Sequence, residues 1–559
     1  MWLGIDVGGT FTDAVIITGG KLVAVAKTPT TLDLLTGILN ALDEVLTKVD
    51  AAAIRRVALS TTLVTNTLVE GRNDPVALLL MPGPGLDMTP LSPVTPWLLS
   101  GYVDHRGRET APPRRGEVEI ACRQLPADGV VAVAGKFSVR NPLPEATVAG
   151  WVRELAAPRH ISLGSEMSGG LNFPRRMNSA YFNASVWRAY GRFASVMEEG
   201  LHQRKIKADV HILKGDGGTM PLAVAARMPV ETIFTGPAAS VLGIMALQTP
   251  VGDAISLDIG GTTTDIALWR NGLPLLAAAG ARIQGFPTAV RSYWLRSVGI
   301  GGDSYVRRDG ERLLVGPQRR GPAMAVGGED PTVTDALRVT EAITYGDAAK
   351  ARRAMAQVAL PGQSLRATAE EILTVAIGEI CRNIGDMMVE EAAAPVYRVE
   401  DIIHPVKFAP ASLLGVGGGA PGLAPRVAAS LAVACHTPRS AQVANAIGAA
   451  VARPTTQVTL RADTVQKCYV VPELGLRREL PNTHMSADAA WELAAKYLQE
   501  RAGREGIAEA PGAVPWETER VLDEEFNVVR GFRTMGKIMT CRLQVKPGVL
   551  TAVNGGEGI

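Results

Sequence analysis

One nine-residue phrase occurs twice in the chain, first as Ile5–Asp13 and again as Leu257–Asp265. Both copies keep Asp, Gly-Gly, Thr, Thr and Asp at the same offsets, and each lies between two apolar runs typical of buried strands. A glycine pair allows a turn with positive φ and leaves backbone N–H groups open to an anion, while threonine hydroxyls add further donors. We therefore interpret each copy as a β-hairpin whose turn binds phosphate, and the pair as a two-sided grip on a nucleoside triphosphate.

The residue types within the phrase suggest a separate role for each position. Asp6 and Asp258 lead the two phrases and are expected to be the catalytic carboxylates that hold a hydrated Mg²⁺. Asp13 and Asp265 close the phrases and are expected to brace the hairpins by accepting backbone N–H bonds. The residues expected to bind the phosphates, with the later threonine of each copy in support, are Gly8, Gly9, Thr10, Thr12, Gly260, Gly261, Thr262 and Thr264.

A third glycine-rich run, Gly415–Gly422, follows an apolar stretch that predicts a strand. It matches the Gly-x-Gly-x-x-Gly fingerprint literally, but Pro421 lies within the turn and no acidic residue follows at the spacing of a dinucleotide-binding fold. We interpret it as a strand–turn–helix whose bare backbone faces adenosine through Gly417, Gly418 and Gly419. The helix predicted at 441–452 is rich in small residues, which suits close packing at a hinge and equally suits an ordinary buried helix.

Alternating strand and helix patterns predict an α/β fold in two halves, 1–205 and 206–455, followed by an α+β extension at 456–559. The first half is expected to end in a long bridging helix at 174–205. The second is expected to begin with a strand at 209–213 and to carry a loop insertion at 299–335. Strands are predicted at 2–7, 13–18, 22–28, 56–60, 75–80, 129–134, 159–163, 253–258, 411–416 and 538–545, and the remaining helices at 32–48, 61–71, 115–124, 143–157, 236–247, 367–392 and 486–502.

Composition narrows the classes of partner. The 559 residues carry a net charge of +2 and are 47% apolar, so nothing favours nucleic acid or a membrane surface as partner. The longest apolar runs have the length of strands rather than of membrane spans. The five cysteines are scattered, and the N-terminal residues do not resemble a signal peptide, which together favour a cytoplasmic setting. The histidines include no His-x-x-x-His pair that would suggest a transition metal.

Six segments in order resemble the hydantoinase A/5-oxoprolinase family of the actin/Hsp70/sugar-kinase ATPase superfamily over about residues 1–455. They are Gly4–Asp13, Ser60–Gly71, Thr235–Gly243, Leu257–Asp265, Ser297–Ser304 and Pro331–Asp335. The resemblance implies two actin-like (ribonuclease H-like) ATPase domains flanking a nucleotide cleft, with ATP and Mg²⁺ as cofactors. It also implies a cyclic amide substrate, a hydantoinase B-like partner subunit and an oligomer.

The implied reaction opens a hydantoin, 5-oxoproline or a related lactam. Amide resonance makes the carbonyl a poor electrophile, and transfer of the γ-phosphoryl group to the carbonyl oxygen turns that oxygen into a leaving group. The protein then contributes positioning and charge neutralisation. Two rivals remain open: a small-molecule kinase of the same superfamily, and a non-enzymatic ATP-gated regulator of a partner protein.

Further candidates lie in segments that resemble the family's substrate side. Asp303 could act as a base or metal ligand, or could stabilise a turn; Ser304 and Asp335 share its surroundings. A strand-to-helix start carries Thr61, Thr62 and Asn66, where helix capping competes with substrate contact. Asp216 is expected near the cleft, with a plain loop as the alternative.

The chain departs from the family at Arg320–Gly328, where relatives commonly carry Asp-Pro-Gly-Pro-x-Cys-Tyr-Gly. The Cys and Tyr of that loop are absent, and a particular substrate is therefore not inherited.

Overall fold

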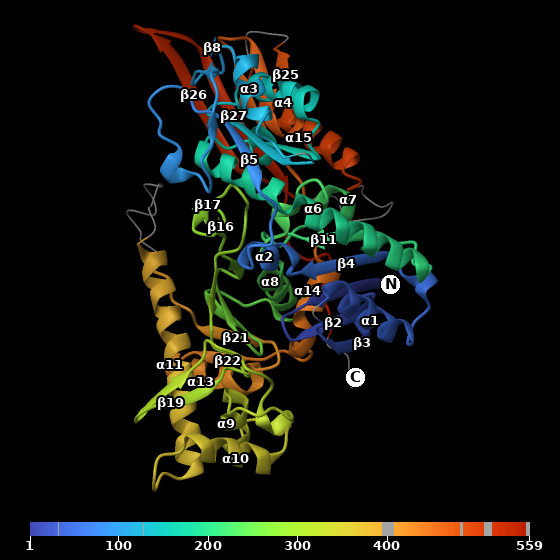
Figure 1. The fold of residues 1–559 in the computed structure, drawn as a ribbon, viewed down its shortest axis with the longest axis vertical. Coiled ribbons are helices and arrows are strands. Elements are labelled where there is room, and N and C mark those ends of the chain that lie inside the picture. The colour runs from blue at the N-terminus through green and yellow to red at the C-terminus, as the bar shows by residue number, and fades with distance from the viewer. Residues whose placement is uncertain (32, 127, 394–406, 481–484, 508–516, 555–559) are drawn as a thin grey trace.

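Two sheets with the same strand order form the centre of the computed structural model, which describes residues 1–31, 33–126, 128–393, 407–480, 485–507 and 517–554 (Figure 1). The strands of the first sheet are β1 (Trp2–Val7), β2 (Phe11–Thr18), β3 (Lys21–Pro29), β4 (Arg56–Thr61), β11 (Asp209–Leu213) and β12 (Thr219–Pro221). Those of the second are β13 (Ala254–Ile259), β14 (Thr264–Arg270), β15 (Leu273–Pro274), β18 (Leu295–Val298), β21 (Ser412–Val416) and β22 (Ala434–His436).

The first sheet runs β3-β2-β1-β4-β11-β12 and the second runs β15-β14-β13-β21-β22, with β18 also paired to β14. In both, an antiparallel hairpin is continued by two strands parallel to the first strand of the hairpin. The repeated phrase thus lies in a repeated sheet, and the predicted α/β class is confirmed.

The predicted boundary between residues 205 and 206 is wrong for the sheet pairing. Strand β11 pairs in parallel with β4, so residues 209–221 complete the first sheet rather than begin the second. An apolar run predicts a strand but does not reveal its neighbour, and the chain makes a long excursion before β11 returns to β4.

That excursion forms a separate inserted unit. Its parallel sheet has the order β10-β9-β5-β6 and is accompanied by a short β7–β8 hairpin. The elements are β5 (Val76–Met81), β6 (Trp97–Leu98), β7 (Tyr102–Val103), β8 (Glu109–Ala111), α3 (Arg115–Cys122), β9 (Val130–Gly135), α4 (Leu143–Ala156), β10 (His160–Leu163) and α5 (Gly164–Met167). The predicted first half therefore contains two sheets rather than one.

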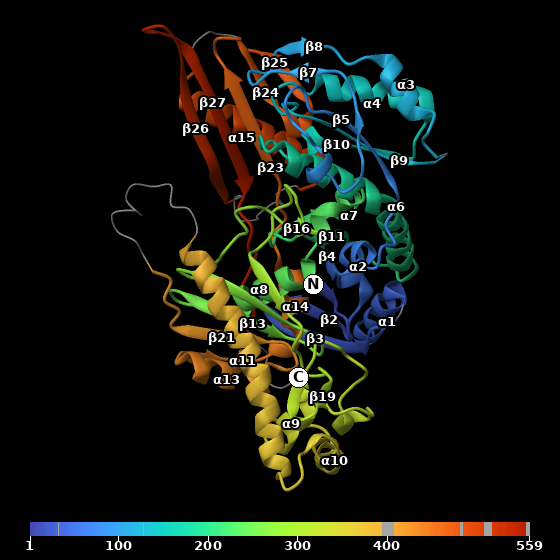
Figure 2. The same cartoon turned by 60° about the vertical axis from the view of Figure 1, so that its left-hand side comes forward.

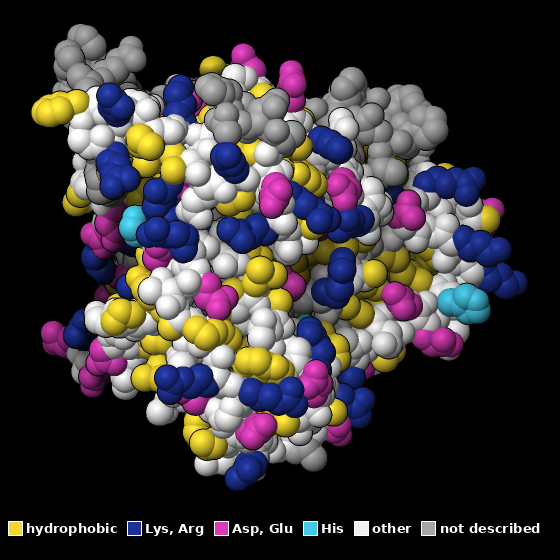
Figure 3. Space-filling view, turned by 90° about the horizontal axis from the view of Figure 1, so that it is seen from above, with side chains coloured by type: hydrophobic (Ala, Val, Ile, Leu, Met, Phe, Trp, Pro, Cys, Tyr) yellow, Lys and Arg dark blue, Asp and Glu magenta, His cyan; other side chains and the backbone are white. Residues whose placement is uncertain are grey.

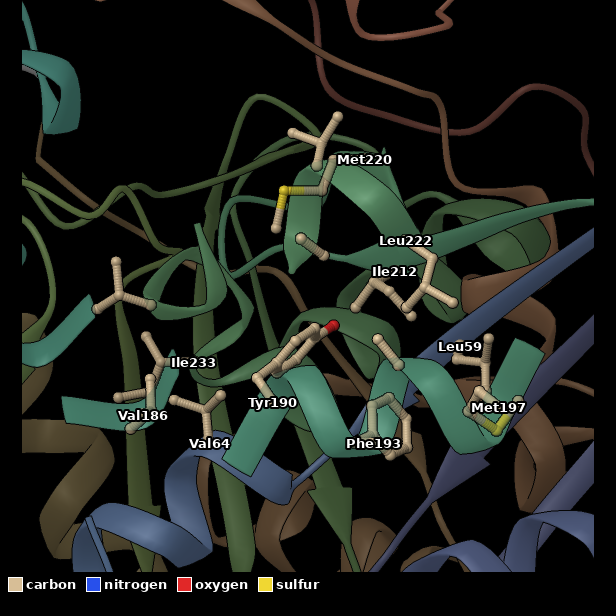
Figure 4. Close-up of a cluster of buried hydrophobic side chains, with 14 of the residues drawn as sticks. Leu59, Val64, Val186, Tyr190, Phe193, Met197, Ile212, Met220, Leu222 and Ile233 are labelled. Carbon is tan, nitrogen blue, oxygen red and sulfur yellow. The ribbon is translucent and has the colours of Figure 1, made fainter. Parts of the chain in front are cut away.

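Helix α6 (Phe173–Gln203) lies between the inserted unit and the first sheet (Figures 1 and 4). It begins where the Asn172 side chain accepts the N–H of Arg175. Its buried Tyr190 and Met197 belong to the apolar cluster that includes Leu59 of β4. The expected bridge to the second half includes the hydrogen bond from Asn178 Nδ2 to the Pro287 carbonyl at 2.9 Å and the packing of Phe182 against Phe286, with ring centroids 6.5 Å apart.

The hinge between the two repeated sheets is made by α8 (Thr235–Gln248) and α14 (Ala444–Val451). A side chain added at Gly243 would lie 2.2 Å from the Ala444 carbonyl oxygen, and one added at Gly448 would lie 2.1 Å from that of Ala239. Only hydrogen fits at these crossings, so the small-residue helix packs closely as predicted.

The remaining elements of the two halves surround these sheets. They are α1 (Leu34–Leu46), α2 (Leu63–Val69), α7 (Leu222–Ala225), β16 (Arg282–Ile283), β17 (Phe286–Pro287), β19 (Val306–Asp309), β20 (Arg312–Val315), α9 (Val333–Val339), α10 (Ala348–Val358), α11 (Leu365–Ala392) and α13 (Ala420–Leu431). The insertion predicted as a loop at 299–335 contains the β19–β20 hairpin and the start of α9.

The C-terminal region has the predicted α+β character. A five-stranded sheet, β25-β24-β23-β27-β26, packs on α15 (Ala487–Arg504), and its strands are β23 (Gln457–Asp463), β24 (Cys468–Val471), β25 (Leu476–Glu479), β26 (Thr518–Arg530) and β27 (Arg533–Val545). It lies beside the inserted unit (Figure 2), where Arg106 forms an ion pair with buried Asp463 at 3.0 Å. The chain then returns to the hinge, where the N–H of Leu550 donates to the Val451 carbonyl at 2.7 Å. The described helices include none with the length and apolar character of a membrane span.

Candidate functional site

The two hairpins that carry the repeated phrase have the same register. Asp6 lies opposite Asp13 across β1 and β2, and Asp258 lies opposite Asp265 across β13 and β14. Both turns close with the same backbone bond: Gly8 N–H to the Phe11 carbonyl and Gly260 N–H to the Thr263 carbonyl, each at 3.0 Å. The sequence repeat is thus a repeat of backbone geometry.

The two turns face each other at close range. A side chain added at Gly261, in the second turn, would lie 3.1 Å from Thr10 Oγ1 of the first turn and 2.8 Å from Asp303 Oδ2. Around Gly9, by contrast, a side chain would meet nothing within 4 Å. Backbone and hydroxyl donors from both halves therefore border one space, as expected for a group held from two sides.

Asp6 and Asp258 approach each other from the ends of their strands. Asp6 is 5% exposed, and its Oδ1 has no hydrogen-bond partner among the described residues. Burial raises the pKa of Asp6 to about 7; the nearby carboxylates of Asp13 and Asp258 raise it further, and a hydrogen bond with Ser60 opposes them. Burial also raises the pKa of Asp258. Two closely spaced carboxylates, one of which has an unused oxygen, suit a divalent cation.

Asn445 links the two carboxylates and was not predicted as a site residue. Its Nδ2 donates to Asp258 Oδ2 at 2.9 Å, and its hydrogen bonding lowers the pKa of both Asp258 and Asp6. It projects from hinge helix α14, so the hinge contacts the candidate site directly. In the sequence, the signal for this role was a single amide residue within a run of small apolar residues.

The first hairpin is supported by its third strand, β3. Lys27 Nζ donates to Asp13 Oδ1 at 2.8 Å and to Oδ2 at 3.0 Å, so Asp13 braces the hairpin through a lysine and not through the backbone N–H groups predicted. Thr12 is fully buried, and its hydroxyl lies 3.3 Å from that of Thr30. It has the supporting position expected of it, behind the turn.

The second hairpin is supported by the segment that follows β18. Thr264 is fully buried and its hydroxyl donates to the Ile300 carbonyl at 2.7 Å, which again places the later threonine behind the turn. Burial raises the pKa of Asp265 to about 7, the charge of Asp258 raises it further, and a hydrogen bond with the Ser297 side chain lowers it. The structure thus gives Asp265 a hydroxyl partner instead of the predicted backbone donors.

The glycine turn at 417–419 closes against the second hairpin. Gly417 has φ +89°, and a side chain there would lie 2.6 Å from both Asp258 Oδ1 and the Ile259 carbonyl oxygen. Gly419 is buried and its N–H donates to the same carbonyl at 2.8 Å. Gly418 is exposed, with nothing within 4 Å of an added side chain. Gly418 alone of the three presents open backbone, while its neighbours press the turn against β13.

Asp303 lies at the second turn, where its N–H donates to the Gly261 carbonyl at 2.6 Å. Arg319 Nε donates to Asp303 Oδ2 at 3.1 Å. Burial raises the pKa of Asp303, and Arg319 opposes that rise. Arg319 was not predicted; it immediately precedes the Arg320–Gly328 segment in which the chain departs from the family.

Ser304 and Asp335 do not have the substrate-facing positions predicted for them. Ser304 is 1% exposed and its Oγ accepts the Gly301 N–H at 2.8 Å. Asp335 is fully buried, and its carboxylate accepts the Thr332 N–H and hydroxyl and the backbone N–H groups of Met324 and Ala325. Because these hydrogen bonds occupy its carboxylate, Asp335 holds a loop onto α9 in a capping box. This local structural role replaces the substrate-side role that the family resemblance implied.

Thr61 also serves the backbone, because it is 1% exposed and its Oγ1 accepts the Leu63 N–H at 3.2 Å. Thr62 Oγ1 accepts Asn66 Nδ2 at 3.2 Å, and both residues remain partly exposed at the start of α2. Asp216 is 5% exposed and accepts the Gly218 N–H at 3.0 Å. It follows β11, two strands from β1, and lines a different cavity.

The described residues contain no cluster of three or more His, Cys, Asp or Glu side chains placed to hold a metal. Asp6 and Asp258 supply two carboxylates, which fits Mg²⁺, an ion that keeps several of its waters and takes one or two protein carboxylates.

Comparison with known families assigns nearly the whole of both halves. Residues 2–156 match the hydantoinase/oxoprolinase N-terminal region, and residues 176–458 match the hydantoinase/oxoprolinase model. The chain belongs to the hydantoinase/oxoprolinase family. The predicted family is therefore confirmed, although the matches do not assign a role to individual residues.

Two characterised relatives are 26% identical to the chain. Caprolactamase subunit alpha of Pseudomonas jessenii aligns over 70% of this chain and 60% of its own length, and the acetophenone carboxylase gamma subunit of Aromatoleum aromaticum aligns over 59% and 52%. The chain thus spans about half to three-fifths of these relatives.

Two solved structures share the fold. The ATP-dependent caprolactamase from Pseudomonas jessenii has a TM-score of 0.69 and 20% identity, covering 97% of this chain and 87% of its own. A nucleotide-free acetone carboxylase has a TM-score of 0.65 and 16% identity, covering 98% and 87%. These likenesses confirm the predicted fold.

Proposed function

We propose that the family member described here is an ATP-dependent hydrolase that opens a cyclic amide. The observation that carries this proposal is the pair of hairpins in identical register, which brings Asp6 and Asp258 together between two glycine–threonine turns. Support comes from the relatives named for caprolactamase, one of them ATP-dependent.

In this proposal the nucleotide lies between the turns. Gly8, Gly9 and Thr10 bind the phosphates from one side, and Gly260, Gly261 and Thr262 bind them from the other. Gly418 faces the adenosine. Asp6 and Asp258 hold Mg²⁺, which when bound neutralises charge on the phosphate oxygens and lowers the barrier to phosphoryl transfer.

The chain's own contribution is preorganisation. Asn445 and Ser60 hydrogen-bond the carboxylates in their charged form, so the metal ligands are held in place before nucleotide arrives. Transfer of the γ-phosphoryl group to the amide oxygen makes the carbonyl carbon electrophilic, and water adds to that carbon. The C–N bond then breaks with the protonated ring nitrogen as leaving group, and hydrolysis of the resulting acyl phosphate gives the ring-opened acid and free phosphate. We assign Asp303 to the substrate side of the second turn, where Arg319 opposes the rise in the pKa of its carboxyl group that burial causes.

Product analysis tests this function. Release of ADP should rise when hydantoin, 5-oxoproline or caprolactam is added, and the organic product should be the ring-opened acid together with free phosphate. A stable phosphoester would support the kinase alternative instead. Absence of any stimulation, with and without a co-expressed partner subunit, would contradict the proposal.

We further propose that the β26–β27 hairpin docks a second subunit, as the subunit names of both relatives suggest. The hairpin extends beyond the rest of the molecule at the top of Figures 1 and 2. Five of its large apolar side chains are exposed, from 37% to 108%: Val521, Phe526, Val529, Phe532 and Met535. Exposed apolar side chains concentrated on one projecting ribbon are typical of a protein interface.

The rest of the upper face offers mixed chemistry, with Lys and Arg interspersed among Asp and Glu (Figure 3). Phe532→Asp should abolish co-purification with a hydantoinase B-like subunit while nucleotide binding persists. Unchanged co-purification would exclude this ribbon as the docking surface.

A cytoplasmic setting remains our proposal, supported by the five free cysteines.

A further inference from the structure

A second cavity lies at the junction of three regions, away from the phosphate hairpins. An inner recess of about 50 Å³ is bordered by the loop after β11, by the start of β23 and by α15. An outer chamber of about 490 Å³ adjoins it and shares Met228, Glu473 and Arg501 among its lining residues. A chamber of this size lies in the range of sites for small organic ligands, about 300–1,000 Å³.

The inner recess is lined by polar atoms that have no hydrogen-bond partner among the described residues. The donors are Arg291 Nη1 and the hydroxyls of Thr455 and Thr456, and the acceptors are Gln457 Oε1 and Glu473 Oε1. Both threonines are only 5% exposed. A buried polar atom without a partner destabilises the folded protein, so five around one recess indicate a site prepared for a polar molecule.

The charges of the recess select the ligand further. Lys214 lies 3.7 Å from Asp216, and Arg501 lies 2.7 Å from Glu505, so these four charges are already balanced in pairs. The remaining charged residues of the lining, Arg291, Glu166 and Glu473, add one cation and two carboxylates. Burial raises the pKa of Glu231 to about 7, so this carboxyl is partly protonated near neutral pH. The balance offers no excess of positive charge for a phosphate, and it suits a neutral or zwitterionic molecule.

The outer chamber has an apolar wall. His160 stacks on Trp187 with ring centroids 4.7 Å apart and planes inclined by 9°. Trp187, Val224 and Leu474 line the chamber together with Arg227 and Arg504. A molecule with a short hydrocarbon part could rest on this wall while its polar end reaches the recess.

We infer that this junction binds a small molecule that carries a carbonyl or carboxylate oxygen together with an N–H group, namely a cyclic amide or the amino acid formed by opening it. The oxygen accepts from Arg291, Thr455 and Thr456, and the N–H group donates to Gln457 and Glu473. The naming of a cyclic amide and its ring-opened amino acid as the two ligands rests on the proposed function. The cavity itself does not involve the hairpin residues.

The junction is distinct from the phosphate site, although both lie at the same edge of the first sheet. The Lys214–Asp216 loop follows β11, and the parallel strands β11, β4 and β1 end at one edge. With strands about 4.8 Å apart, the loop begins roughly 10 Å from the end of β1. The junction is therefore a neighbouring ligand site rather than part of the phosphate grip.

Calorimetric titration of the full-length protein tests the inference. The probes are caprolactam and 5-oxoproline as cyclic amides, and 6-aminohexanoate and glutamate as their ring-opened forms. Thr455→Val combined with Thr456→Val removes both unpaired hydroxyls at nearly constant volume, and should weaken binding of the preferred probe at least about tenfold. Thr368→Val is the matched control, because Thr368 is equally buried but lies on α11.

Two further measurements separate this inference from the proposed function. The double variant should bind a Mg²⁺–ATP analogue as well as the parent does, and Asp6→Asn should lose turnover while still binding the junction probe. Preference for a cyclic amide identifies a substrate subsite, and preference for an amino acid identifies a product site; either supports the inference. No binding of any probe, or binding that the double variant leaves unchanged, would overturn it.

Discussion

The two phosphate hairpins share their register but differ in what supports their second strands. In the first, Lys27 forms an ion pair with Asp13 at 2.8 Å from a third strand of the same sheet. In the second, Asp265 has a hydroxyl partner, Ser297, and the turn is held by the 300–303 backbone. In both halves the partner comes from a strand that pairs with the second strand of the hairpin, but in the second half that strand, β18, continues directly into the segment that leads toward the proposed substrate.

This difference indicates a division of labour. The closing aspartate of the first hairpin, Asp13, has a cation beside it, so this hairpin can act as a fixed wall. The closing aspartate of the second, Asp265, has a pKa raised to about 7, and this hairpin contacts Asp303, Gly302 and the glycine turn at 417–419. Movement or chemistry on the substrate side would reach the phosphates through the second hairpin.

The largest effect is expected at the glycine turn. Gly417→Ala places a methyl group 2.6 Å from Asp258 Oδ1 at φ +89°, which should cost about 2–3 kcal/mol and weaken nucleotide binding roughly 30–150-fold. Gly418→Ala is the control, since nothing lies within 4 Å of its added methyl. Equal affinities of the two variants, measured by calorimetry with a Mg²⁺–ATP analogue, would show that the turn does not support the second hairpin.

Removal of the first hairpin's lysine comes next. Lys27→Met leaves the 8%-exposed Asp13 without its cation and should lower the melting temperature by roughly 3–8 °C, because an unpaired buried carboxylate is costly. Ser297→Ala, the counterpart in the second hairpin, removes only a neutral partner and should lower it by about 1–2 °C. Equal melting temperatures of the two variants would show that the lysine and the serine contribute equally to stability, against this expectation.

Asn445→Ala removes a donor that serves both halves. Because this hydrogen bonding lowers the pKa of Asp258 and Asp6, its loss should raise the pKa of both carboxyl groups. The pH at which Mg²⁺–nucleotide binding is half-maximal should therefore move upward, with about tenfold weaker binding at pH 7. Binding profiles of the variant and parent that superimpose across pH 5–9 would exclude this role.

The smallest effect concerns the pH dependence of stability without nucleotide. Asp265 has a raised pKa of about 7 in the folded protein, so its contribution to stability is present below the pKa of an unfolded aspartate, about 3.9, and is lost as pH rises through about 7. Asp265→Asn should therefore raise the melting temperature above pH 7. Asp13→Asn should raise it less, because burial also raises the pKa of Asp13 but Lys27 opposes that rise. Equal shifts in the two variants would contradict the asymmetry.

The sequence predicted the hairpins well because their requirements are local. A glycine pair between apolar runs specifies a turn, and two copies specify two turns. Pairing across the chain was not predictable in this way: β11 joined the first sheet, and Lys27 rather than the backbone braced Asp13. Both outcomes depend on strand neighbours that no local pattern records.

The substrate side was predicted less well for a physical reason. Ser304 and Asp335 were chosen by resemblance, and the structure commits both to backbone hydrogen bonds within buried loops. Arg319 and Asn445 were missed because a lone arginine or asparagine has no distinguishing spacing. The residues around the junction cavity come from segments as far apart in the sequence as Glu166 and Gln544, and only folding brings them together.

The central claim is that one Mg²⁺–nucleotide is held by both hairpins at once. Equilibrium binding of Mn²⁺ with a non-hydrolysable ATP analogue to the parent, to Asp6→Asn and to Asp258→Asn tests it most directly. The account predicts that each single variant weakens metal–nucleotide binding by at least about tenfold, because both carboxylates hold the same ion. Loss of binding in one variant with unchanged binding in the other would show a one-sided site and contradict the account.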